Sequence, residues 1–232
     1  KASDPALLAY RELLPGAVAR ASEIGQREHV AFRVLCQHAV RPAAAARGAV
    51  LDRRQRHDDL LALTRLVEIR HRNLENFRAY VKAGVYPSNV YEPNQLNVWR
   101  DQDGHFCAAA TIIRMSGQTE LVDRVADQNN FIRLADVSQG PVMDWILTSG
   151  FTQEELVAIQ KPFMPVTEKP VIAPSTPVAV DAKLRAAETA RLRAVYRKVE
   201  HDLVKNEKRD LDLAVTRLMK HPDLAWKIAS AE

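Results

Sequence analysis

The side chains best suited to chemistry in this sequence are Cys107 and His105, which lie two residues apart. If the segment is a strand, positions i and i+2 face the same side, so the imidazole could take the proton of the thiol. If a helix begins directly after Cys107, its dipole would also favour the thiolate. The pair therefore raises the hypothesis of a thiol-dependent enzyme, although the sequence offers no third group to orient the histidine.

Cys36 is the only other cysteine, and it suggests a structural role for Cys107 instead. In an oxidising compartment the two residues would form a disulfide that ties the first helices to the segment around Cys107. In a reducing compartment both would be buried, inert thiols. We expect the disulfide, and we treat catalysis by Cys107 with His105 as the minority hypothesis.

Other motifs that carry chemistry are incomplete. Cys36 and His38 resemble half of a zinc site, but no second Cys/His pair lies nearby in the sequence. Asp101 and Asp103 precede a glycine as in a calcium loop, but the further spaced ligands are missing, so a turn explains them better. No glycine-rich phosphate loop or metalloprotease motif is present. We therefore expect no metal and no cofactor.

Charges are distributed unevenly along the chain, whose net charge is +4. Residues 1–83 carry a net +6, residues 84–180 carry −5 and residues 181–232 carry +3. A basic cluster at 53–57, RRQRH, could meet phosphate, but no stacking aromatic or recognition motif accompanies it. A basic protein that binds nucleic acid or an anionic polymer is thus a further alternative, and solvated helix faces are the simpler explanation.

Composition and apolar periodicity predict a mainly α-helical fold, a helical bundle. Only 8 of the 232 residues are glycine, and helix-forming residues dominate. The clearest helical pattern runs from 58 to 82 and ends before Gly84. Residues 97–108 instead predict one small β-hairpin around an Asp-Gly turn, which must lean on helices to be stable. Thr152 and Glu155 have the spacing of a capping box for a helix over 153–160.

Three segments with different roles follow from these patterns. Residues 1–161 would form a helical globular domain that contains the hairpin. Residues 162–180 hold five prolines and predict an extended Pro-rich linker. Residues 181–232 predict a charged helical tail, whose narrow apolar seam suits packing on another helix better than forming its own core. The tail residues expected to contact a partner are Leu192, Val195, Val199, Leu203 and Trp226.

A resemblance covers about residues 70–163. The run DGHFCAA from Asp103 to Ala109 resembles a D-x-x-G-x-x-C-A-V-G module, and the neighbouring runs NFRAY, GVYPSN and GFTQEE resemble its setting. This module is typical of exported bacterial proteins with no established activity, so the resemblance implies export but assigns no catalytic residue. Ala109 and Ala110 stand where the module has valine and glycine.

Together these features predict a non-enzymatic protein that acts through protein–protein contacts, with the tail helix as its docking element. The linker, the narrow seam and the lack of a complete catalytic motif support this prediction. The implied location is the periplasm, the outer envelope or the outside of a bacterial cell, in a multi-subunit assembly. No apolar run approaches the roughly 18–20 residues of a membrane-spanning helix, so no transmembrane segment is expected. The sequence does not identify the partner.

Overall fold

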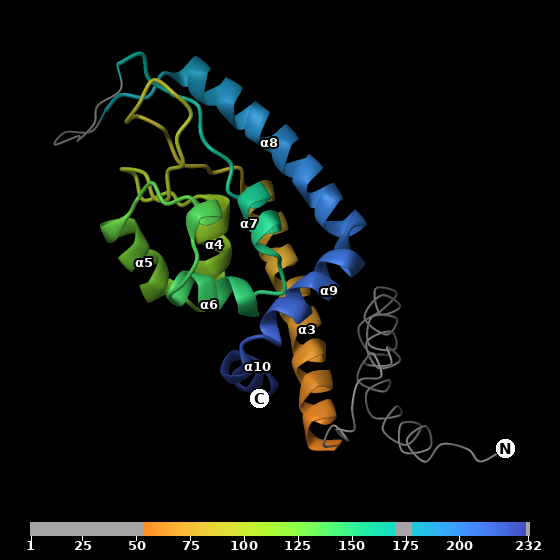
Figure 1. The fold of residues 1–232 in the computed structure, drawn as a ribbon. Helices are drawn as coiled ribbons and strands as arrows, with labels where there is room; N and C mark the ends of the chain where they lie inside the picture. The colour runs from red at the N-terminus through yellow and green to blue at the C-terminus, as the bar shows by residue number, and fades with distance from the viewer. Residues whose placement is uncertain (1–52, 170–177, 231–232) are drawn as a thin grey trace. The chain divides into compact units, whose positions relative to one another are not determined.

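The computed structural model describes residues 53–169 and 178–230, which form eight α-helices and one 3₁₀-helix (Figure 1). Contacts divide the chain into residues 1–60 and 61–232; helix α3 begins in the first unit and enters the second, which holds all the other described elements. The elements are α3 (Arg53–Ala83), α4 (Ala108–Met115), α5 (Thr119–Gln128), η1 (Leu134–Asp136), α6 (Pro141–Thr148), α7 (Gln153–Ile159), α8 (Ala182–Lys205), α9 (Glu207–Leu218) and α10 (Pro222–Ala229).

The predicted mainly α-helical fold is confirmed, but the predicted hairpin at 97–108 is wrong. The described residues contain no strand, and this segment holds only an isolated bridge between Arg100 and Phe106. The pairing cannot extend further because α4 begins at Ala108. On the other side, the backbone N–H of Trp99 donates to the carbonyl of Asn130 at 2.8 Å, and that of Arg100 donates to Asn130 Oδ1 at 2.9 Å. The segment is therefore a turn held against the loop after α5.

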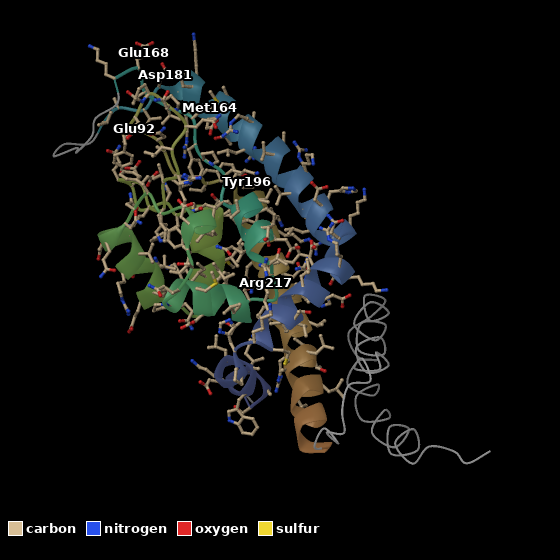
Figure 2. All side chains as sticks on the ribbon, viewed as in Figure 1. Glu92, Met164, Glu168, Asp181, Tyr196 and Arg217 are labelled. Carbon is tan, nitrogen blue, oxygen red and sulfur yellow. The ribbon has the colours of Figure 1, made fainter. Side chains whose placement is uncertain are left out.

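Helix α8 belongs to the same core as α3 and α4. Leu192 and Tyr196 of α8 are fully buried in the apolar cluster that contains Phe77 of α3. Figure 2 labels Tyr196 beside α8. The Tyr196 ring lies edge-on to Phe77, with centroids 5.6 Å apart, and its centroid lies 5.7 and 5.4 Å from those of Tyr80 and Tyr86. The apolar seam of the tail thus packs on this chain's own helices.

The first part of the proline-rich segment contacts the loop before α4. Phe163 exchanges two backbone hydrogen bonds with Leu96, at 2.8 and 3.0 Å, and the backbone N–H of Val166 donates to the carbonyl of Asn89 at 3.1 Å. Phe163 and Val166 are both buried. The backbone N–H of Asp181 in turn donates to the Val166 carbonyl at 2.9 Å, which fixes the start of α8 to this segment.

A buried ion pair between Arg70 of α3 and Glu155 of α7 joins several parts of the unit. Nη1 and Nη2 of Arg70 donate to the two carboxylate oxygens of Glu155 at 2.9 and 2.7 Å. The same nitrogens donate to the carbonyls of Gly150 and Leu203, at 2.9 and 3.0 Å. Glu155 also accepts from the backbone N–H of Thr152, which confirms the predicted capping box. One guanidinium thus ties the last turn of α8 and the start of α7 to α3.

Gly150 allows the chain to pass close to α3 at this point. Its φ is +78°, a left-handed conformation that favours glycine. A Cβ here would lie 2.5 Å from Cβ of Arg70 and 2.6 Å from the carbonyl oxygen of Leu66. The bond from Arg70 to the Gly150 carbonyl therefore depends on the absence of a side chain.

We predict that Arg70→Ala destabilises the fold by about 3–5 kcal/mol, because it leaves the Glu155 carboxylate buried without its partner. The matched control is Arg65→Ala on the same helix, whose ion pair with Glu68 is exposed and contributes at most about 1 kcal/mol. Arg70→Lys keeps the charge but loses the two-pronged geometry, so its loss should be intermediate. Urea unfolding followed by circular dichroism measures all three; equal losses for Arg70→Ala and Arg65→Ala would contradict the prediction.

Candidate functional site

Cys107 lies at the start of α4, as the sequence predicts, but its thiol is buried. The residue is 1% exposed, and its Sγ accepts a hydrogen bond from the backbone N–H of Ala110 at 3.4 Å. Burial raises the pKa of the thiol to about 12, although the backbone N–H groups of Ala110 and Ala109 act to lower it. The helix start therefore does not produce a thiolate at neutral pH, because removal from water outweighs the dipole.

His105 has a different environment from that of Cys107. Its Nδ1 lies 3.1 Å from Oδ2 of Asp101, and its ring is more than a third exposed. Among the described residues no hydrogen bond joins this imidazole to the thiol, so the structure does not bring the base and the nucleophile of the enzyme hypothesis together.

The predicted disulfide between Cys36 and Cys107 is a separate question. Cys107 has no disulfide partner among the described residues, and Cys36 lies outside them, so the disulfide stays a prediction.

Asp101 organises the turn that leads into Cys107. Its Oδ1 accepts from the backbone N–H groups of Asp103 and His105 at 3.0 and 2.8 Å, and its Oδ2 accepts from the backbone N–H of Ser88 at 2.9 Å. Ligand-type atoms of Asp101, Asp103 and His105 lie within 4.8 Å of one another, a spacing that a metal ion could bridge. The backbone N–H groups of the turn and of Ser88 bind both oxygens of Asp101, and these bonds account for the position of its carboxylate.

The residues predicted to contact a partner lie in different environments. Leu192 is fully buried in the core, Val199 and Leu203 are nearly so, and Val195 is half-buried. Trp226, on α10, is 52% exposed. Three of the four α8 residues share a further property, since Val195, Val199 and Leu203 line one groove.

This groove lies between α7, α8 and α9 and has a volume of about 470 Å³. Five of its fourteen lining residues are apolar, and each of the three helices contributes at least one of them; we call this set the apolar strip. The strip consists of Ala158 of α7, Val195, Val199 and Leu203 of α8, and Leu213 of α9. Leu213 is 46% exposed, so much of its side chain is open to contact with another molecule.

Three ion pairs flank the apolar strip, and each joins two side chains of this chain. They are Lys198 with Asp202 at 2.7 Å, Arg209 with Asp210 at 2.8 Å, and Arg217 with Glu154 at 2.8 Å. The Lys198 hydrogen bond lowers the pKa of the Asp202 carboxyl, and the Arg217 hydrogen bond lowers the pKa of the Glu154 carboxyl. Lys161 also lines the groove and forms no ion pair with a described residue, whereas the charges of these three pairs are already matched, so the apolar strip is the main surface that the groove offers to a ligand.

Sequence reasoning missed Ala158 and Leu213. On α9, Leu211, Val215 and Leu218 form the helical stripe that predicts a buried face, and all three are buried. Leu213 lies off that stripe. A large apolar residue outside the stripe is a weak signal, since single exposed apolar residues are common, but it could have pointed to a second contact face.

The chain matches no family model, no curated protein and no solved structure. The resemblance of residues 70–163 to exported bacterial proteins therefore stays a prediction. Within residues 53–169 and 178–230, no helix is both long enough and apolar enough to cross a lipid bilayer.

We predict that Cys107, in a Cys36→Ala background, resists iodoacetamide at about pH 8 in the folded protein and reacts once the protein is unfolded in urea. The reagent cannot reach the thiol because the residue is buried, and the raised pKa keeps the thiol protonated, so little reactive thiolate is present. Mass spectrometry after timed quenching measures the labelled fraction. Labelling of the folded protein as fast as the unfolded chain would revive the thiol-enzyme hypothesis.

The raised pKa of Cys107 also predicts that stability depends on pH. The folded state holds the thiol proton up to about pH 12, whereas an unfolded cysteine loses it near pH 8.5. Between these values the unfolded state binds fewer protons, so the free energy of unfolding falls as pH rises. In the Cys36→Ala background, urea titrations at about pH 8 and pH 10 should show a fall about 2 kcal/mol larger than in the same protein with Cys107→Ala. Equal falls in the two proteins would contradict the prediction.

Proposed function

We propose that this chain is a non-enzymatic protein that binds an apolar segment of another protein in the groove between α7, α8 and α9. The observation that carries the proposal is the apolar strip that these three helices build, which includes the half-exposed Leu213. A groove of this kind suits an amphipathic helix, whose apolar face can lie along the strip.

The chemistry of the groove favours an apolar anchor over a charged one. Fully burying a leucine side chain contributes roughly 1.5–3 kcal/mol, and Leu213 still has about half of its surface in water. Glu154, Lys198, Asp202, Arg209 and Asp210 are held in ion pairs, so a charged partner side chain that met one of these residues would have to break an existing ion pair. We therefore expect an uncharged, apolar face on the bound segment.

The tail helices keep a role in this proposal, but not that of a free docking element. Leu192 and Tyr196 of α8 are buried in the core. Val195 and Val199, on the same helix, line the groove. Binding consequently requires the folded unit, because α8 supplies only one wall and α7 and α9 supply the others.

The proposed location is the bacterial envelope or the outside of the cell, and the resemblance of residues 70–163 is its support. The alternative of nucleic-acid binding concerned the basic cluster at 53–57, whose side chains lie outside the described part of the chain. The alternative of a thiol-dependent enzyme has little support from a thiol that is buried and protonated.

A matched pair of substitutions tests the proposal, Leu213→Asp and Val204→Asp. Both residues are 46% exposed, but only Leu213 lines the groove. A photo-crosslinking amino acid at position 213 of the full chain should capture one partner protein, and the same amino acid at position 204 should not. The purified partner should bind Val204→Asp as it binds the wild type, and bind Leu213→Asp at least tenfold more weakly, a difference of about 1.4 kcal/mol.

Equal binding of the partner by the two variants would overturn the proposal. A cross-linked product with the mass of two copies of this chain would also overturn it, because the groove would then serve self-association. Circular dichroism of both variants establishes that a loss of binding does not come from unfolding.

A further inference from the structure

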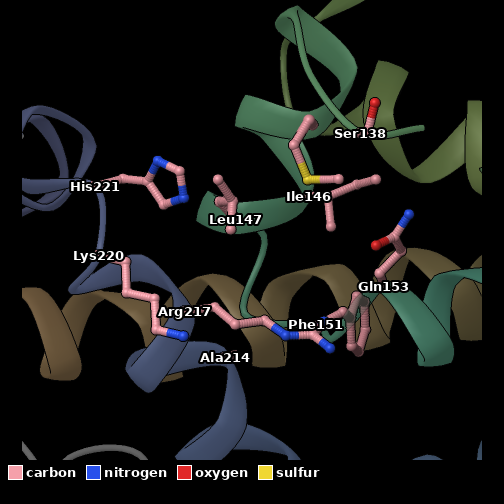
Figure 3. Close-up of a pocket in the computed structure, with 10 residues that line it drawn as sticks. Ser138, Ile146, Leu147, Phe151, Gln153, Ala214, Arg217, Lys220 and His221 are labelled. Atoms are coloured by element: carbon pink, nitrogen blue, oxygen red, sulfur yellow. The ribbon is translucent and has the colours of Figure 1, made fainter.

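A second pocket lies between α6, α7 and α9 and shares no lining residue with the groove (Figure 3). Its volume is about 250 Å³. Half of its ten lining residues are apolar. These are Met143, Ile146 and Leu147 of α6, Phe151, and Ala214 of α9. An alkyl group placed against them would leave water for an apolar surface, which is favourable.

The remaining side of this pocket is basic. Arg217, Lys220 and His221 line it, and Figure 3 shows Arg217 and Lys220 on the side of the pocket opposite Leu147 and Ile146. No carboxylate is among the described residues that line it. Neither Lys220 nor His221 forms an ion pair with a described residue, whereas Arg217 donates to Glu154 at 2.8 Å.

We infer that this pocket binds a short, unbranched alkyl carboxylate. The alkyl chain would lie against the apolar side chains, and the carboxylate would meet Arg217 and Lys220, since a guanidinium pairs well with a planar carboxylate. The ligand must be short, because the pocket is smaller than the roughly 300–1,000 Å³ that drug-sized molecules occupy. This inference goes beyond the proposed function, because it concerns a different pocket and a different class of ligand.

Glu154 competes with such a ligand for Arg217. The Arg217–Glu154 pair is exposed, with side chains 38% and 71% accessible, so it contributes little and can be exchanged. A ligand carboxylate gains Lys220 in addition to Arg217. Removal of the Glu154 charge should therefore strengthen binding of the carboxylate, whereas removal of the two cations should weaken it.

The test is an NMR titration of the full chain at about pH 7 with hexanoate, hexanol and hexylamine, three probes with the same chain and different charge. Hexanoate should shift the methyl signals of Met143, Ile146 and Leu147 and bind at least fivefold more tightly than hexanol, and hexylamine should bind most weakly. The double variant Arg217→Gln/Lys220→Gln should lose at least fivefold in hexanoate affinity and keep its hexanol affinity. Lys227→Gln, on α10 and outside the pocket, is the matched control and should bind as the wild type does.

Glu154→Gln should bind hexanoate at least twofold more tightly, and added salt should weaken hexanoate binding more than hexanol binding. The inference is overturned if hexanoate leaves these three methyl signals unchanged or if hexanoate and hexanol bind equally well. It is also overturned if the double variant binds hexanoate as Lys227→Gln does. All four substituted side chains are exposed or half-exposed, and circular dichroism checks that each variant is folded.

Discussion

The ion pair between Arg70 and Glu155 is the interaction that supports both the groove between α7, α8 and α9 and the basic pocket between α6, α7 and α9. Arg70 donates to the side-chain carboxylate of Glu155 and to the backbone carbonyl of Leu203. Both Glu155 and Leu203 line the groove. Phe151, whose ring centre lies 4.9 Å from the Arg70 guanidinium carbon, lines the basic pocket. Burial raises the pKa of the Glu155 carboxyl, and the hydrogen bonds from Arg70 oppose this rise. The two-pronged contact with the guanidinium offsets part of the cost of burying the two groups. The Arg70 side chain of α3 thus contacts residues that line the groove and a residue that lines the basic pocket.

Cys107 shows how two physical effects on one residue can be ranked. The start of α4 supplies backbone N–H groups that favour a thiolate, and the surrounding core withdraws the sulfur from water. Burial wins, since the pKa rises to about 12. The nearby Asp101 carboxylate serves the turn rather than the thiol, because its oxygens bind the backbone of Asp103, His105 and Ser88. The residues around Cys107 suggest a reactive thiol in the sequence, but in the structure they stabilise the turn that leads into α4.

Local signals in the sequence were sufficient for much of the fold but not for the candidate site. The apolar periodicity of 58–82 corresponds to α3, and the spacing of Thr152 and Glu155 to the cap of α7, since both depend on residues a few positions apart. The hairpin prediction failed because the next rung of the ladder is lost: the Trp99 N–H donates to the carbonyl of Asn130, thirty residues away, and the Cys107 carbonyl accepts from Thr111 of α4. Periodicity also revealed the seam of α8, but it could not reveal which helices the seam packs on or that Leu213 would complete a groove.

The close approach of Gly150 to α3 has an evolutionary consequence. Any substitution there would have to accommodate a new Cβ against Arg70 and against the Leu66 carbonyl, in a left-handed conformation that other residues rarely adopt. A lineage could change this glycine only if it also shifted the backbone of α3, and so moved the arginine that aligns α7 and α8. Related chains that keep this fold should therefore be recognisable by glycine and arginine inherited together at these two positions, even where their surfaces have diverged.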